Sequence, residues 1–556
     1  MDTRRLVLLF IFGFSVLMLW DAWEKEHRPK PAAQAVVPAV PAAPAAAPGI
    51  ATPPATAAKA ADVSVPGASV PAATKGEAIV VRTDLVIAEF DTLGATLKRL
   101  ELLKHKDAAD VTQNLVLLGP DHQYEAQSGV TGEGGPNHRT LWTVEPGERT
   151  LGAGAKELEV RFSAQGKDGL TVVKRYRFKR DSYEIEVSLE LKNTGSAPLS
   201  PATYFQFTHN GKTSADSNSI AHSFGARSFN GFAVYTEEKK FQKIQLPDVD
   251  KGKADYVKQA SDGWLAYVEH YFVAGWIPPA NAARSYEVLK RDDGVYAGYV
   301  RLPVGTLAPG AAKTESMELY AGPQEQRRLE AVAPGFDLVV DYGWLTIIAW
   351  PLFWLLEKYH LLSGNWGVAI ILLTVTIKLV FFPLSAASYK SMAKMKLVTP
   401  RMQKIREMYE HDRQKMNQAM MDLYRTEKIN PLGGCFPILV QIPVFIALYW
   451  VLLAAIELRH APFVLWIKDL SALDPYYVLP ILMTVTMVLQ TRMNPTPPDP
   501  VQAKVMQFMP FIFSIFFFFF PAGLVLYWLV NNILSILQQW QIQRMFERGK
   551  PAHAKR

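Results

Sequence analysis

Long apolar runs follow residue 343, and the first uninterrupted one constrains the fold more than any other feature. Residues 366–384 form nineteen positions with a single charge, Lys378. About twenty apolar residues in a helix are enough to cross a bilayer. A lysine near the centre of such a helix costs roughly 2.5–3.5 kcal/mol on insertion scales. We therefore predict that Lys378 faces protein or water inside a bundle of membrane helices.

Further apolar segments extend this prediction to six membrane spans. Residues 1–28 begin with two arginines and an apolar run, and no small-residue cleavage site follows, so we predict an uncleaved anchor. Residues 339–362 are apolar but interrupted by Pro351. This pattern predicts a helix along the membrane surface, with a re-entrant segment as the alternative. The remaining four spans are predicted at about 433–454, 475–490, 505–520 and 523–540.

The part between the anchor and these helices has a different pattern. Residues 29–75 are rich in Ala and Pro and predict an extended linker. In residues 76–338, apolar and polar positions alternate, most clearly over 183–192, which follow 170–178 across a turn. Alternation with little helical periodicity predicts a large antiparallel β-sandwich. Further strands are expected at 78–81, 85–90, 157–163 and 316–321.

Basic residues in the loops predict the orientation of the chain. Residues 385–430 hold ten Lys or Arg against five acids, and the tail 541–556 is also basic. Loops rich in Lys and Arg stay in the cytoplasm. With six spans, both termini are then cytoplasmic and the β-sandwich lies outside.

Polar residues on several predicted spans could line one groove with Lys378. Such a groove would be wet enough to stabilise the ammonium group. The alternative is that Lys378 extends along its own methylene stem toward the cytoplasm, and an open groove would satisfy both interpretations. The candidate groove residues are Lys378, Thr374, Gln441, Tyr527, Trp528 and Asn531; Ser385 falls on the helical face of Lys378, and Ser535 shares a face with Asn531 and Trp528.

Residues 385–430 also hold seven of the 16 Met, interleaved with basic residues. Helical periodicity on both sides of residues 410–412 predicts a helical hairpin. Flexible Met side chains suit surfaces that accept varied apolar partners, although they could equally pack the two helices together. The basic face could lie near anionic lipid or ribosomal RNA. The candidate contact residues are Met392, Met395, Met402, Met408, Lys394, Arg401 and Lys404.

Several other functions find little support. No nucleophile–base pair, phosphate loop or metal motif occurs in the membrane half, and His209, His222 and His270 are scattered. We therefore predict no catalytic residues, no cofactor and no metal. The single cysteine, Cys435, excludes an intrachain disulfide. A transporter or channel, and an anchored carbohydrate-binding or isomerising protein, are alternatives, but no span carries the carboxylate that proton-coupled transport usually needs.

Six motifs in the membrane half resemble the Gram-negative YidC family of membrane protein insertases. They are SMAKM at 391–395, NPLGGCFP at 430–437, QIP at 441–443, APFVLWIKDLS at 461–471, DPYY at 474–477 and GLVLYW at 523–528. The resemblance implies a five-helix insertase core over 363–540 with a cytoplasm-facing groove, and a β-supersandwich in the periplasm between residues 24 and 340. Lys378 would occupy the basic position of the groove, where Arg stands in the best-known member.

The resemblance also implies a function and partners. The chain is expected to be an inner-membrane insertase and chaperone, not an enzyme, with Thr374, Gln441, Tyr527 and Trp528 along the substrate path. Nascent membrane proteins would be its clients. The ribosome, the Sec translocon and anionic lipids would be its partners, and it would act as a monomer.

Overall fold

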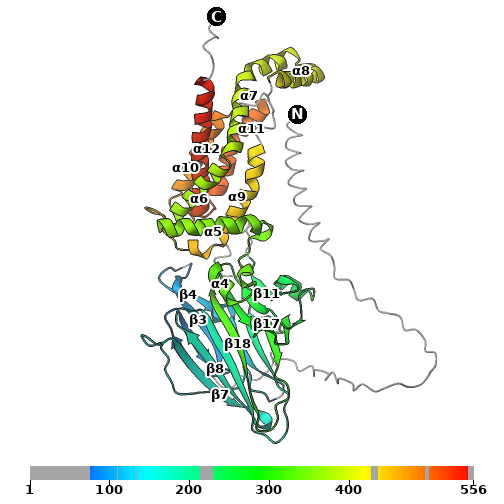
Figure 1. Ribbon diagram of the computed structural model, residues 1–556, viewed down its shortest axis with the longest axis vertical. Coiled ribbons are helices and arrows are strands. Elements are labelled where there is room, and N and C mark those ends of the chain that lie inside the picture. The colour runs from blue at the N-terminus through cyan, green and yellow to red at the C-terminus, as the bar shows by residue number, and fades with distance from the viewer. Residues whose placement is uncertain are drawn as a thin grey trace, which may run out of the picture.

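A computed structural model of the chain describes residues 76–108, 110–132, 134–212, 229–427, 436–494 and 500–548. The predicted anchor at 1–28 and linker at 29–75 lie outside these residues, as does Cys435. The β-domain and the helices are stacked along the long axis of the molecule, and one helix, α5, crosses between them (Figure 1). The molecule therefore divides into a β part and a helical part, as the sequence predicts.

The β-domain consists of two sheets of nine strands, and every strand pair within them is antiparallel. The first sheet has the order β1 (Ala78–Arg82), β2 (Val86–Asp91), β3 (Thr96–Lys106), β5 (Glu125–Thr131), β10 (Ala202–His209), β17 (Tyr296–Pro303), β16 (Arg284–Lys290) and β13 (Gln259–Ala260), with β4 (Asn114–Leu118) also paired to β3. The second has the order β12 (Lys240–Ile244), β11 (Gly231–Thr236), β14 (Trp264–Val268), β15 (Phe272–Ile277), β18 (Ala312–Pro323), β9 (Glu184–Asn193), β8 (Leu170–Lys179), β7 (Glu157–Gln165) and β6 (Thr143–Val144).

Strand β8 shows how the alternating pattern builds these sheets. Its residues alternate between buried and partly exposed along the whole strand. The outward-facing Arg177 donates to Glu186 of β9 at 3.0 Å. The predicted hairpin is confirmed, since β8 and β9 pair from Leu170 with Asn193 to Phe178 with Ile185. The strands predicted at 78–81, 85–90, 157–163 and 316–321 fall within β1, β2, β7 and β18, apart from the first residue of the second.

Aromatic side chains from the two sheets fill the space between them. Phe90 of β2 lies 4.5 Å from Tyr176 of β8, ring centre to ring centre. Phe207 of β10 stacks on Trp276 of β15 at 5.2 Å. All four rings are almost fully buried. These contacts confirm the predicted sandwich, because they join residues of opposite sheets in one core.

The end of the β-domain folds back on the second sheet before the chain reaches the helices. Helix α4 (Gln326–Val332) is followed by the 3-10 turns η4 (Phe336–Val339) and η5 (Gly343–Leu345). The ring of Phe336 lies 4.8 Å from that of Trp264. The domain border predicted at residue 338 therefore falls inside η4. Helix α5 (Thr346–Ser363) then runs without interruption through Pro351, across the ends of the other helices (Figure 1).

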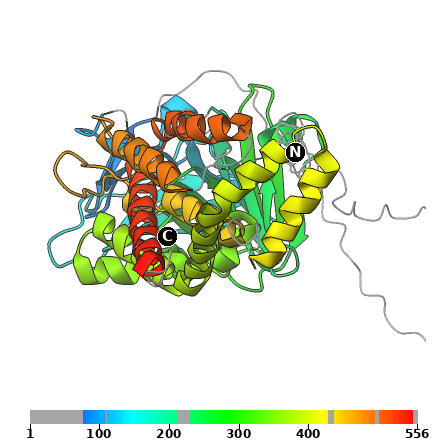
Figure 2. The same ribbon diagram turned by 90° about the horizontal axis from the view of Figure 1, so that it is seen from above.

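The helical part contains α6 (Trp366–Val380), α7 (Phe382–Met408), α8 (Arg413–Thr426), α9 (Phe436–Ala454), α10 (Val478–Met493), α11 (Pro500–Phe517) and α12 (Ala522–Arg548). Helix α12, red in Figure 2, packs against α6, α7 and α10. Among the described residues, no helix taken singly combines the length and apolar composition for a membrane crossing. Helices α6 and α7 meet both criteria only as a pair, and they are bent by 66° where they join.

Helix α7 differs from the prediction for this region. We expected a span to end at residue 384 and a separate hairpin to begin at 385. Instead α6 ends at Val380, and α7 continues for 27 residues from Phe382 to Met408. Pro383 lies in the first turn of α7, where its missing N–H leaves no hydrogen bond unmade. The hairpin consists of the distal half of α7 and α8, joined near residues 410–412. Similarly, α12 extends past the predicted end at 540 into the basic tail.

Candidate substrate groove

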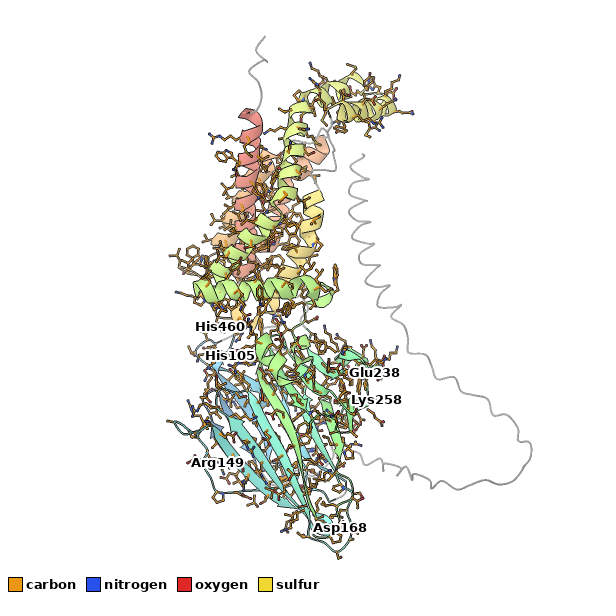
Figure 3. All side chains as sticks on the ribbon, in the orientation of Figure 1. His105, Arg149, Asp168, Glu238, Lys258 and His460 are labelled. Atoms are coloured by element: carbon orange, nitrogen blue, oxygen red, sulfur yellow. The ribbon has the colours of Figure 1, made fainter. Side chains whose placement is uncertain are left out.

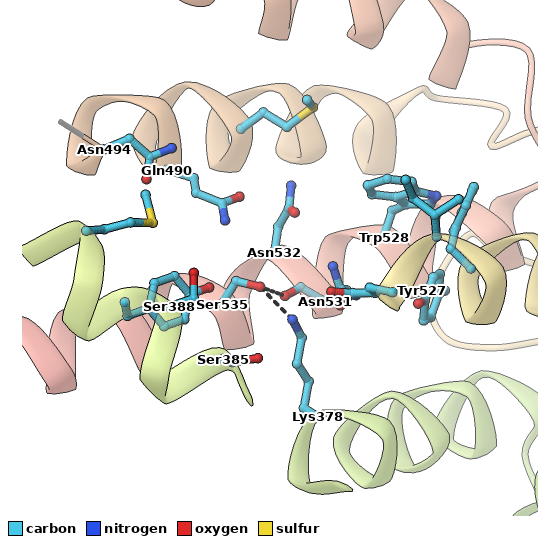
Figure 4. Close-up of a pocket in the computed structure, with 16 residues that line it drawn as sticks. Lys378, Ser385, Ser388, Gln490, Asn494, Tyr527, Trp528, Asn531, Asn532 and Ser535 are labelled. Carbon is cyan, nitrogen blue, oxygen red and sulfur yellow. Dashed lines mark hydrogen bonds between the residues drawn. The ribbon is translucent and has the colours of Figure 1, made fainter. Parts of the chain in front are cut away.

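Five helices surround a cavity of about 330 Å³ in the helical part (Figure 4). Each of α6, α7, α9, α10 and α12 contributes side chains to its wall, so the cavity depends on the whole bundle. Most of the lining side chains are polar, which is unusual for the interior of such apolar helices. The lining residues are Lys378, Ser385, Ser388, Tyr389, Met392, Gln441, Ile442, Phe445, Met487, Gln490, Asn494, Tyr527, Trp528, Asn531, Asn532 and Ser535.

Lys378 lies in the last turn of α6 and points into this cavity. Its side chain is only 7 % exposed. The ammonium nitrogen donates to Ser535 Oγ of α12 at 2.7 Å, and Ser535 Oγ donates in turn to the Asn531 carbonyl at 2.7 Å (Figure 4). A buried ammonium needs such acceptors, because it has lost most of its contact with water. The charge is therefore held across the groove by the helix on its far side.

Toward Trp528, the groove combines an amide pair with aromatic rings (Figure 4). Gln441 Nε2 of α9 donates to Asn531 Oδ1 at 2.9 Å. The ring of Trp528 packs edge-on against Phe445 at 4.6 Å and against Phe517 at 5.4 Å. Its Nε1 is buried and has no hydrogen-bond acceptor among the described residues. The groove thus offers a charge, amides and an apolar wall within one cavity.

The structure brings five of the six predicted groove residues together. Lys378, Gln441, Tyr527, Trp528 and Asn531 all line the cavity. The sixth, Thr374, does not line the cavity.

Thr374 is 1 % exposed and lies one turn before Lys378 on α6. Its hydroxyl donates to the Ile370 carbonyl of the same helix at 2.7 Å. Thr and Ser often satisfy their hydroxyl in this way within apolar helices. Helical spacing alone predicts that Thr374 shares a helix face with Lys378. It does not reveal that the hydroxyl is bonded within the helix.

Other lining residues were not singled out from the sequence. Gln490 in the last turn of α10 and Asn494, which directly follows that helix, both line the cavity. Asn494 Oδ1 accepts from Gln539 of α12 at 3.1 Å. Gln490 lies inside an otherwise apolar run, and this pattern could have identified it as a groove residue. The remaining lining residues that sequence reasoning missed are the polar Ser388, Tyr389 and Asn532 and the apolar Ile442, Phe445 and Met487.

The Met-rich hairpin contains both methionines that pack its two helices together and methionines that are exposed to a partner. The sequence left these two roles open. Met402 is 2 % exposed and packs with Val398 between α7 and α8. Met395, Met420, Leu423 and Tyr424 pack against this small core. Met408, in contrast, is 71 % exposed.

The other candidate residues on α7 face different surroundings. Met392 lines the groove. Arg401 pairs with Glu427 at the end of α8, while Lys404 is exposed and Lys394 is partly buried. Only part of the Met-rich surface is therefore available to a partner.

The fold and the groove define a two-part protein, with a large β-sandwich domain and a helical bundle that holds the groove. A family model described as YidC periplasmic domain matches residues 78–355, and one described as 60Kd inner membrane protein matches residues 358–549. The chain belongs to the YidC family of membrane protein insertases, which are not enzymes.

Two curated relatives show how far this similarity extends. The membrane protein insertase YidC of Methylobacillus flagellatus is 51 % identical over 99 % of this chain and 98 % of its own length. That of Aromatoleum aromaticum is 51 % identical over 99 % of both chains. A crystal structure described as active YidC insertase covers 83 % of this chain and 94 % of its own, at 19 % identity and a TM-score of 0.37. That structural likeness is too weak to add to the family assignment.

Proposed function

We propose that the groove receives hydrophobic segments of nascent membrane proteins and releases them into the inner membrane. The observation that carries this proposal is the Lys378 ammonium, held at 2.7 Å from Ser535 inside a cavity that many polar side chains line within an otherwise apolar bundle. A client's polar flank would find water and hydrogen-bond partners there. The groove would thereby shorten the apolar barrier that the flank has to cross.

Lys378 would attract acidic residues in the translocating part of a client. An ammonium group is a compact charge on a flexible stem, so it can follow a moving carboxylate without a fixed bidentate geometry. Gln441, Asn531, Tyr527 and Trp528 would line the path. Their amides and rings can serve many sequences, because none of them demands a single ligand shape.

The proposed topology has six spans, with both termini in the cytoplasm and residues 24–340 in the periplasm. The basic loops at 385–430 and 541–556 support this orientation. Helix α5 would lie along the periplasmic membrane surface. Its exposed Trp350 and Trp354 support that position, since tryptophan favours the level of the lipid headgroups.

The hairpin of α7 and α8 would meet clients before they reach the groove. Met408 and Met392 would contact apolar segments, while Arg401, Lys394 and Lys404 would approach the ribosome or anionic lipids. Met395 and Met402 would act through the packing of the hairpin. The chain would work as a monomer, alone or beside the Sec translocon, since the groove is complete within one chain.

Site-specific photocrosslinking tests the client path. A crosslinking residue in place of Trp528 should capture stalled nascent chains of an inner-membrane protein, because this ring lines the groove. The same residue in place of Trp354, which is exposed on α5, is the matched control and should capture far less. Equal capture at both positions, or no capture at 528, would contradict the proposed path.

A further inference from the structure

The charge of Lys378 has no acidic partner among the described residues that line the groove. The polar side chains around it are hydroxyls, amides and one indole. Labelled carboxylates of the β-domain, such as Asp168 and Glu238, lie on the far side of α5 from the helical bundle (Figure 3). The described part of the groove therefore offers this ammonium group neutral acceptors.

Ser535 of α12 supplies a hydroxyl that accepts from the ammonium group. Lys378 Nζ lies 2.7 Å from Ser535 Oγ, and Ser535 is 4 % exposed. The hydroxyl donates its own proton to the Asn531 carbonyl, one turn earlier on the same helix, at 2.7 Å (Figure 4). Because a hydroxyl has a single proton to donate, this bond leaves the Ser535 oxygen to act as an acceptor toward Lys378.

The bond to Ser535 holds the ammonium group against the α12 wall of the cavity. Lys378 lines the cavity, although its side chain is only 7 % exposed. Its flexible four-carbon stem allows the charge to turn away from the wall. The cavity, of about 330 Å³, has room for this movement. Turning toward a client in the cavity therefore costs the hydrogen bond to Ser535.

A carboxylate is a stronger partner for the ammonium group than a hydroxyl is. Opposite charges attract each other in a way that a neutral acceptor cannot match, most of all where water is scarce. An acidic side chain of a client can therefore take the Lys378 ammonium from Ser535. A neutral hydroxyl or amide of a client gains little by doing so, because it only replaces an equivalent acceptor.

We propose that Ser535 is a stand-in acceptor, which holds the Lys378 ammonium between clients and yields it to a client's carboxylate. This rests on the function proposed above and adds a residue that sets how long an acidic client stays in the groove. When the client leaves for the lipid, Ser535 takes the ammonium back. The recovered hydrogen bond favours release, so that a buried charge attracts acidic tails without retaining them.

Replacement of Ser535 by alanine removes the competing acceptor and changes the size of the side chain little. The wild type recovers a hydrogen bond when the client leaves, and the Ser535→Ala variant does not. This variant should therefore release a client with an acidic tail more slowly, on the order of fivefold. Ser535→Thr keeps a hydroxyl at the same position and should restore the faster release.

Time-resolved photocrosslinking of the full chain in membrane vesicles measures the release. A nascent chain with an acidic tail is stalled on the ribosome and then freed with puromycin. A crosslinking residue in place of Trp528 captures it on irradiation at successive times. The decay of the captured fraction gives the release rate.

Ser514→Ala is the matched control for the loss of a buried hydroxyl. Ser514 of α11 is also 4 % exposed and donates to the Pro510 carbonyl, four residues earlier, at 2.6 Å. It is not among the described residues that line the cavity. Its variant should release the client at the rate of the wild type.

The double variant Lys378→Ala/Ser535→Ala separates this role from a general effect on the groove. If Ser535 acts through the ammonium group, its loss should not alter release in the Lys378→Ala background. The proposal is overturned if Ser535→Ala leaves release unchanged or speeds it, although capture is normal. It is equally overturned if the slowing persists in the double variant. Absence of capture in every protein would overturn this proposal together with the proposed function.

Discussion

Lys378 shows how the bundle accommodates a charge that is unfavourable in an apolar helix. Lys378 is 7 % exposed, and its nitrogen is held by Ser535 on another helix. The free-energy cost of its charge in an apolar helix is offset by polar side chains in a cavity that five helices build together. In the proposed function, the charge would consequently be available to a client without being exposed to lipid.

Substitutions of Lys378 should separate charge from shape. For a client with an acidic tail, Lys378→Ala should slow insertion by about tenfold, the effect of losing roughly 1.4 kcal/mol of attraction. Lys378→Glu should slow it further through repulsion, and Lys378→Arg should insert nearly as the wild type. Protease protection of the translocated tail in vesicles measures the rate.

A client with a neutral tail provides the control for these variants. Its insertion should change little in Lys378→Ala, because the attraction depends on the acidic residues. Normal insertion of the acidic client by both the Ala and Glu variants would remove the charge from the mechanism.

Individual elements were largely predictable from local patterns. Alternation identified β8 and β9 and their turn, because it reflects burial on one face of a strand. Apolar runs identified the regions of α9, α10, α11 and α12. The length of α7 was not predicted, because the apolar run continues to residue 384, whereas α6 already ends at Val380 and α7 begins at Phe382, with Pro383 in its first turn.

The α7–α8 hairpin offers a matched pair of methionines at opposite exposures. Met402→Ser should loosen the hairpin by about 2–4 kcal/mol, because a buried apolar side chain is lost and a hydroxyl is left inside. Met408→Ser should change its stability little. Hydrogen exchange of the α8 amides reports on this packing.

The two variants should rank in the opposite order when the crosslinking of clients is measured in place of hairpin stability. Met408→Ser should weaken crosslinking of nascent chains to the hairpin, although the hairpin itself stays intact. If both variants exchanged alike, the small core around Met402 would not hold the two helices together.

At the scale of the whole molecule, the arrangement depends on contacts distant in sequence. Strand β10 lies between β5 and β17, whose residues are far from it along the chain. The groove likewise joins residues from 378 to 535. Local patterns do not record such pairings, so neither the strand order nor residues such as Ser388 and Asn532 could be derived from them.

The turn η4 at the end of the β-domain should contribute strongly to the stability of that domain as an isolated fragment. Phe336 is fully buried, and its ring contacts Trp264 at 4.8 Å and Tyr320 at 5.5 Å. Phe336→Ala in a fragment of residues 76–342 should therefore lower the free energy of unfolding by about 3–5 kcal/mol. Urea denaturation followed by tryptophan fluorescence measures this difference.

Leu338→Ala in the same fragment is the control, since Leu338 is exposed in the full chain. It should unfold at nearly the urea concentration of the parent fragment. A similar loss in both variants would mean that the last turn contributes through its backbone and not through the Phe336 ring.

The edge strands of the sandwich affect how readily the domain could pair with an unfolded client chain. Each sheet ends on one side in a strand of only two residues, β13 in one and β6 in the other. A long free edge would invite any unfolded chain nearby to add itself as a further strand. A protein that handles unfolded segments is exposed to this risk continually. On these two sides the edge strands leave little backbone for a client to pair with, whereas the other edges, β1 and β12, are five residues long.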